Sequence, residues 1–454
     1  MTLRFARSVA RPFVPLALVT LLGCLLSACG GGGGGSTATP TYWTNVAPIY
    51  YDKCVGCHQA GGIGPFALDN YASAKAHAAD ASAMVEQNLM PPFLVDHSGS
   101  CGDFEDDETL SAAQKATIKS WVAAGAPEGQ PRTLTLEPPP HLEQGTDYQT
   151  PDFAPEPQGG ALAAHDEYRC FLLESGLTAP RFITGYEVMP GNAAIVHHVL
   201  VFTVDAAKSV GGGKTNGDVM AALDAASPDR LGWPCFGAAG EGVDVESVPV
   251  TWAPGQGVVS YPSGVGVPMA TTEKVVVQIH YNLADPATHG MRDQTTVRLR
   301  FADSVQRQAV FLLPDPFLDS LGEATPATLP PGQASATYSW RQSAQDLGLG
   351  TLPYVDILGV MPHMHERGHR LELRQIDDDA SAADTGTCIA KVDAWDFHWQ
   401  KMYGYRAPPR LTGTSAISVT CDYDTRNATE PVLPGWGTQN EMCLTVLMVA
   451  LPPN

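Results

Sequence analysis

Residues 195–203 read Ile-Val-His-His-Val-Leu-Val-Phe-Thr, and residues 274–281 read Lys-Val-Val-Val-Gln-Ile-His-Tyr. Both runs are rich in β-branched and apolar residues, as buried β-strands are. Similar runs lie at residues 296–301, 355–360, 371–376 and 415–421, with Gly/Pro turns between them. Short strands separated by such turns predict β-sandwiches. About 300 residues are long for one sandwich, so we expect two all-β sandwich domains, at residues 158–305 and 306–454.

The N-terminus has the features of an export signal. Three arginines at positions 4, 7 and 11 precede an apolar run at residues 14–26, which is short for a membrane span. Leu-Ser-Ala-Cys at residues 26–29 resembles a lipobox, which implies a signal peptide at 1–28, a lipid on Cys29 and a Gly-rich tether at 29–40. Ordinary secretory cleavage near Ala28 is the alternative. We expect an exported protein on the periplasmic side or cell surface, and Gly30 favours the outer membrane by the same resemblance.

Charge and cysteine content restrict the partners and the compartment. The formal net charge of −21 argues against nucleic acid as a partner, because phosphate binding needs a basic surface. Six cysteines remain after the signal region and the pair at residues 54 and 57: Cys101, Cys170, Cys235, Cys388, Cys421 and Cys443. An even number in an exported chain predicts disulfides, although six cysteines allow 15 pairings.

A C-x-x-C-H motif at residues 54–58 predicts a covalent haem c. The thiols of Cys54 and Cys57 can add to the haem vinyl groups, and His58 then becomes an axial iron ligand. A structural zinc or a redox pair is the alternative, but no second Cys pair completes a zinc site. Met90 is the expected sixth ligand of the iron, and Met84 is its rival. The alternative for either methionine is ordinary packing in the protein core.

The surroundings of this motif predict a small all-α cytochrome c domain at residues 41–130. The stretch is Ala-rich, and residues 111–124 have the apolar spacing of a helix that ends at Gly125. A Met-Pro between the haem motif and the last helix resembles small class I cytochromes c. A Pro-rich linker at residues 131–157 would tether this domain to the β region.

Histidines in the β region can hold metals. His363 and His365 are two apart, so on a strand they point to one face and can share an ion. His197 and His198 are adjacent and face opposite ways, unless the backbone bulges there or the rings bind through different nitrogens. Taken alone, His280 is an ordinary strand histidine and Met442 an ordinary packing residue.

Together and in this order, these segments resemble the copper type II, ascorbate-dependent monooxygenases. The resemblance runs from about Tyr168 to the C-terminus and includes Tyr-Arg-Cys at 168–170, Trp-Asp-Phe-His-Trp-Gln at 395–400, and Cys-Asp-Tyr at 421–423. It implies two facing β-sandwiches and a Cys421–Cys443 disulfide. One copper would be held by His197, His198 and His280 and would pass electrons. The other, held by His363, His365 and Met442, would bind O2 and act catalytically on the substrate.

The sequence departs from the peptide-amidating members of this family near the substrate. Met361 stands where those enzymes carry an Arg, and Leu444 and Val446 replace an Asn and a Tyr. We therefore expect hydroxylation of a C–H bond of a small, rather apolar organic molecule. Electrons would come from an external donor, such as a cytochrome, a quinol-linked donor or an ascorbate-like reductant, through the haem to the imidazole copper. The alternatives are a non-catalytic copper-binding or electron-transfer lipoprotein and a copper reductase or oxidase.

Overall fold

The computed structural model describes residues 39–453 except 61, 63, 106, 136–140, 159–164, 229, 236–237, 255, 284, 380–385, 398 and 436–438. The predicted signal peptide and the lipidated Cys29 lie outside the described residues. Among the described residues, no helix is long and apolar enough to cross a membrane.

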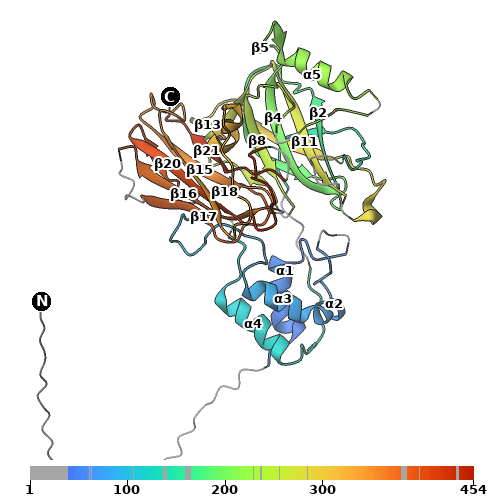
Figure 1. Cartoon of the computed structure of the whole chain (residues 1–454). Helices are drawn as coiled ribbons and strands as arrows, with labels where there is room; N and C mark the ends of the chain where they lie inside the picture. Colours follow the sequence, from blue (N-terminus) through green and yellow to red (C-terminus); the bar gives the residue numbers. More distant parts are fainter. Residues whose placement is uncertain are drawn as a thin grey trace, which may run out of the picture. The chain divides into compact units, whose positions relative to one another are not determined.

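The predicted helical region is a cluster of short helices (Figure 1) with an aromatic core of its own. Its elements are η1 (Tyr42–Val46), α1 (Ala47–Lys53), α2 (Tyr71–Ala76), α3 (Ala78–Glu86) and α4 (Ala112–Ala123). The core includes the fully buried Tyr42, Tyr50, Ile118 and Trp121. Helix α4 begins with a capping box between Ser111 and Gln114, which satisfies N–H groups that the first turn leaves unpaired.

The N-terminal sandwich packs a five-stranded sheet against one part of a ten-stranded sheet. The smaller sheet has the order β7 (Trp233–Pro234), β2 (Asp166–Leu173), β11 (Glu273–Asn282), β4 (Val196–Asp205) and β8 (Ser247–Trp252). In the larger sheet this domain supplies β1 (Gly145–Gln149), β12 (Thr296–Ala302), β3 (Arg181–Met189) and β10 (Val265–Met269). Residues 275–277 of β11 are fully buried because β11 is central and both of its faces are covered.

The C-terminal sandwich repeats this arrangement. A four-stranded sheet of β14 (Ala336–Ser343), β20 (Ser415–Tyr423), β16 (Gly368–Asp377) and β17 (Thr387–Val392) faces the rest of the ten-stranded sheet. That part consists of β13 (Arg307–Leu312), β21 (Leu444–Ala450), β15 (Tyr354–His363), β18 (Tyr403–Gly404) and β19 (Arg410–Thr412), which pairs with β15. The tenth strand of the sheet is β9 (Val259–Ser260), which pairs with β3 in the N-terminal part. The Cys421–Cys443 disulfide is confirmed, and Cys170–Cys235 and Cys101–Cys388 are also paired.

One sheet joins the two sandwiches. Strand β10 pairs in parallel with β13, and β13 pairs in antiparallel with β21. The expected boundary near residue 305 falls just before β13. Beside this junction, Asp356 accepts hydrogen bonds from both Arg307 (2.7 Å) and Arg410 (2.8 Å). Backbone hydrogen bonds of one sheet therefore run from one sandwich into the other, which is not the case for domains joined only by a flexible hinge.

The expected linker at residues 131–157 is partly folded structure. Strand β1 pairs along its whole length with β12, and Phe153 forms two backbone hydrogen bonds with Asp293, each 2.9 Å. This stretch was predicted wrongly because β1 is an edge strand with a single buried residue, Tyr148. One apolar position in five residues is too little periodicity to mark a strand.

Residues 93–105, here called the docking segment, pack on the C-terminal sandwich rather than on the helices. Phe93, Val95 and Phe104 belong to the core of that sandwich. The backbone N–H of Asp96 donates to Lys391 (2.8 Å), that of Glu105 donates to Gly404 (2.8 Å), and Cys101 is disulfide-bonded to Cys388. The region expected at 41–130 as a tethered domain is therefore clamped covalently and by its own core residues.

Candidate metal centres

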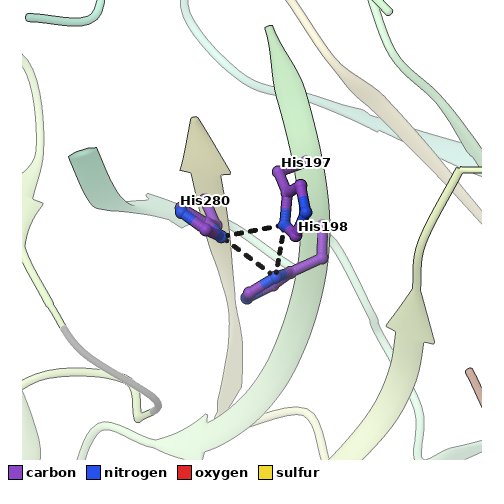
Figure 2. Close-up of side chains that lie close together, drawn as sticks. All are labelled: His197, His198 and His280. Atoms are coloured by element: carbon purple, nitrogen blue, oxygen red, sulfur yellow. Dashed lines mark hydrogen bonds between the residues drawn. The ribbon is translucent and has the colours of Figure 1, made fainter. Parts of the chain in front are cut away.

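Three histidines converge on one point in the N-terminal sandwich (Figure 2). The Nδ1 atoms of His197, His198 and His280 lie 3.1, 3.2 and 3.4 Å from one another. An atom equidistant from all three would be about 1.9 Å from each, close to the metal–imidazole bond length of about 2.0 Å. Three ring nitrogens cannot all satisfy one another by hydrogen bonds, because each offers only one proton or one lone pair. The geometry fits a metal ion with three imidazole ligands.

A β-bulge brings the adjacent histidines to the same side. In the pairing of β4 with β11, His198 lies opposite His280, but the next partner of Tyr281 is Val196. His197 is thus the extra residue of the bulge, and its side chain turns toward the other two. Of the two possibilities that the sequence left open, the backbone irregularity is confirmed, and all three rings present the same nitrogen.

Neighbours of His280 orient its ring for metal binding. Its Nε2 lies 3.2 Å from Oδ1 of Asp166, and both side chains are almost fully buried. The ring of Tyr168 stacks on it with centroids 4.1 Å apart and planes 6° apart. A carboxylate on the far nitrogen holds a ligating imidazole in the correct tautomer and raises its basicity. Burial lowers the pKa of His198 well below its ordinary value, which keeps this ring in the neutral form that metals need.

The second centre lies where β15 ends. Nδ1 of His363 is 2.7 Å from Oε1 of Gln400, and Nδ1 of His365 is 3.1 Å from the carbonyl oxygen of Asn440. With Nδ1 occupied, Nε2 of each ring would be the metal-binding nitrogen. Met442 is 2% exposed and lines the same cavity as both rings. Burial lowers the pKa of His363 to about 4, against the opposing effect of Gln400. Two neutral imidazoles and a thioether suit copper, and Cu(I) in particular.

Glu441 holds the loop that carries His365. Its carboxyl oxygens accept hydrogen bonds from the backbone N–H groups of His365 (2.8 Å) and Arg367 (2.7 Å). Glu441 is fully buried, and burial raises the pKa of its carboxyl group to about 8. Because Glu441 directly precedes Met442, one side chain ties together two of the three ligands of this centre.

A cavity connects the two centres. His198 lines it from the N-terminal sandwich, and His363, His365 and Met442 line it from the C-terminal sandwich. It encloses about 780 Å³, counting the part open to solvent. The ring of Phe397 lies between the centres, with its centroid 6.3 Å from His197 and 5.9 Å from His365. Candidate ligands from both sandwiches therefore border one shared space, His198 from the first set and all three residues of the second.

The C-x-x-C-H residues differ from the other cysteines of the chain. Among the described residues, Cys54 and Cys57 are the free cysteines, and the other six form disulfides. Nδ1 of His58 is 3.0 Å from the carbonyl oxygen of Phe66, so its Nε2 would be the metal-binding nitrogen. Met90 is partly buried, whereas Met84 is 42% exposed on α3. These two thiols and this histidine fit covalent haem attachment.

Asp166 is the functional residue that the sequence analysis missed. It lies 32 residues from His198 and 114 from His280, and nothing in its local sequence marks it. Only the pairing of β2 with β11, in which Tyr168 faces His280, brings it to the cluster. Gln400 and Glu441 lie inside motifs that carry the family resemblance, but their contacts with the ligands are visible only in the structure.

Comparison with known proteins agrees with this geometry. Residues 161–287 match the N-terminal domain of the copper type II ascorbate-dependent monooxygenases, and residues 327–451 match the C-terminal domain. The chain is 25% identical over 273 residues to tyramine beta-hydroxylase of Caenorhabditis briggsae, covering 57% of this chain and 40% of that protein. It is 24% identical over 287 residues to dopamine beta-hydroxylase of Rattus norvegicus, covering 61% and 42% respectively.

A third relative is DBH-like monooxygenase protein 1 of Homo sapiens, 23% identical over 208 residues, covering 45% of this chain and 33% of that protein. The chain thus spans well under half the length of these relatives. The matched domains cover both sets of candidate ligands; the three histidines of the first set converge, and the three residues of the second set line one cavity. With its two copper-domain sandwiches in this order, the chain belongs to the copper type II ascorbate-dependent monooxygenase family.

Proposed function

We propose that the protein is a copper-dependent monooxygenase that hydroxylates a C–H bond of a small organic substrate. One C–H bond, one O2, two electrons and two protons become one C–OH and one water. Amino-acid side chains do not supply such electrons, whereas copper bound at the two centres does. The observation that supports the proposal is the cavity bordered by ligands from both sets, because substrate, O2 and electrons must meet there.

Each part of the cavity has a role in this proposal. His363, His365 and Met442 hold the catalytic copper, and Gln400 and Glu441 fix the orientation of that site. His197, His198 and His280 hold the electron-supplying copper. Burial keeps the rings of His198 and His363 neutral and hence able to bind metal.

The test is anaerobic reduction of the copper-loaded protein, followed by O2 and a panel of C–H substrates. Mass spectrometry should find a product 16 mass units heavier that takes its oxygen from 18O2. His363→Ala should abolish the product and keep the three-histidine copper. A non-catalytic copper-binding or electron-transfer lipoprotein would bind both coppers and consume O2 without forming any such product.

We further propose that the helical region carries a covalent haem c through Cys54, Cys57 and His58, with Met90 as the other axial ligand, and that electrons reach copper from it. The free thiols support the attachment. The docking segment supports the electron transfer, because it begins three residues after Met90 and packs on the C-terminal sandwich. Tyr403, which this segment contacts, is three residues from Gln400, the partner of His363.

This arrangement differs from a donor held only by a flexible tether. Proteolytic cleavage between residues 131 and 141 should leave anaerobic haem-to-copper transfer rapid and independent of protein concentration, because the clamp persists. Cleavage combined with reduction of Cys101–Cys388 should slow the transfer. A rate that becomes concentration-dependent after cleavage alone would favour the tether, and reduced haem that coexists with Cu(II) for minutes in the intact chain would refute the electron-transfer role.

Export and anchoring are also part of the proposal. The Arg-rich start, the apolar run and Cys29 support a lipoprotein on the periplasmic side or the cell surface, most simply in the outer membrane. Mass spectrometry of the mature N-terminus should find a diacylglyceryl group on Cys29. Cys29→Ser should release the protein from the membrane fraction, and a chain that is cleaved but carries no lipid would refute the anchor.

A further inference from the structure

The cavity between the copper centres has an apolar wall. Among its described lining residues, no side chain is an aspartate, glutamate, lysine or arginine. Apart from the metal ligands, the wall is built mainly from apolar residues, among them Leu200, Phe202, Val248, Trp252, Met361 and Val446. Such a wall stabilises a bound molecule by burial of apolar surface and gives an ionic group no partner.

Three carboxylates close to the metal ligands lie outside the described lining of the cavity. Asp166 is engaged by His280, and Glu441 accepts the backbone N–H groups of His365 and Arg367. Glu366 follows His365 directly but is exposed and is not part of the lining. None of these three carboxylates therefore offers a direct contact to an ammonium ion at the described wall of the cavity.

Two of the polar side chains of the wall are also used within the protein. Gln400 contacts His363 through Oε1 and donates through Nε2 to the carbonyl of Phe397 (2.7 Å). The indole N–H of Trp252 donates to the carbonyl oxygen of Gln256 (2.8 Å). The remaining polar side chains of the wall, apart from the metal ligands, are the uncharged hydroxyl groups of Tyr168 and Thr251, so the described wall offers no charge to pair with an ionic substrate.

We propose that the substrate is a neutral, apolar molecule, of the alkylbenzene or hydrocarbon class, that carries neither an ammonium nor a carboxylate. This inference rests on the proposed function, since it concerns the same cavity. A charged group without a partner would lose its hydration on binding, and nothing in the described wall would replace it. Two of the relatives are named after amines, tyramine and dopamine. The substrate proposed here differs from these in having no ammonium group.

The test compares two probes with the same number of heavy atoms, propylbenzene and 2-phenylethylamine. Binding to the copper-loaded full chain at pH 7 is followed by tryptophan fluorescence and calorimetry, without reductant or O2. Propylbenzene should bind about 100-fold more tightly or better, because an unpartnered charge is strongly rejected by a buried site. Equal or tighter binding of the amine would overturn the inference, as would a failure of both probes to bind.

Variants at Thr251 test whether the two probes bind in this cavity. Thr251 lines the wall, is 3% exposed and already carries a polar group. Thr251→Asp adds a carboxylate and should reduce the propylbenzene preference at least about tenfold, whereas the matched Thr251→Asn should leave it. An unchanged preference in a folded, copper-loaded Thr251→Asp protein would overturn the inference. If the preference holds but no probe is ever hydroxylated, the proposed function fails and the assigned ligand class stands.

Discussion

Replacement of Asp166 by Asn tests how the three-histidine centre is built. The substitution keeps the size of the side chain and removes the negative charge 3.2 Å from Nε2 of His280. Both side chains are buried, at 1% and 6% exposure, so solvent cannot substitute for the lost charge. Among the described residues neither atom has a hydrogen-bond partner, so this charge contact is the polar interaction that the substitution removes. The full effect should therefore appear in copper binding.

The expected size follows from this burial. Loss of a carboxylate partner behind a ligating histidine typically weakens metal binding about 10- to 100-fold, which corresponds to about 1.4 to 2.7 kcal/mol. Asp166→Ala should be at the upper end of this range, because it removes the packed side chain beside Nε2 of His280 as well as the charge. The second centre should keep its affinity, since Asp166 does not line the shared cavity.

The assay is a competition titration of Cu(I) against a chromophoric chelator, with electron paramagnetic resonance of the Cu(II) form to identify the centre affected. Asp293→Asn is the matched control: Asp293 is also buried in the N-terminal sandwich, but it contacts Tyr281 and Thr295 rather than a histidine. That control should lose stability and keep copper affinity. Asp166→Asn with copper affinity within twofold of the wild type would show that the contact does not orient His280.

Three further perturbations have separate readouts. The haem should survive acid–acetone extraction in the wild type, and Cys57→Ala should weaken its attachment; complete extraction from the wild type would remove the case for haem c. Met442→Ala should lower the metal content from two coppers per chain to one, and retention of both would mean that Met442 is not a ligand. Because the pKa of His363 is about 4 in the folded apo-protein and about 6.5 in an unfolded chain, the stability of the apo-protein should fall as pH drops from about 6.5 toward 4. Urea unfolding at pH 7 and 5 measures this, and His363→Asn should flatten the dependence; an equal fall in that variant would assign it to other groups.

Strands were predictable wherever an apolar run was long enough. The runs at residues 195–203 and 274–281 became β4 and β11, and helix α4 begins and ends where its capping residues indicated. Edge strands were not predictable, and β1 is the example, because a strand with one buried residue leaves no period to detect. The candidate metal ligands were predicted from the family resemblance, because residue type and spacing alone left His280 and Met442 as ordinary residues; the structure brings His197, His198 and His280 together.

What the sequence determined by itself is therefore chemical: the ligand types, the free C-x-x-C-H thiols and the apolar runs that must be buried. The tertiary structure decided which atoms meet. The bulge at His197, the use of Nδ1 in one centre and the partner of His280 all depend on residues supplied by other strands. The position of the docking segment was also decided by the tertiary structure. Its apolar residues suit the core of the helical region as well as that of the C-terminal sandwich, and the contacts of Cys101 and Val95 assign it to the sandwich. Local sequence carries side-chain chemistry, whereas strand register and ring orientation are set by packing between segments tens to hundreds of residues apart.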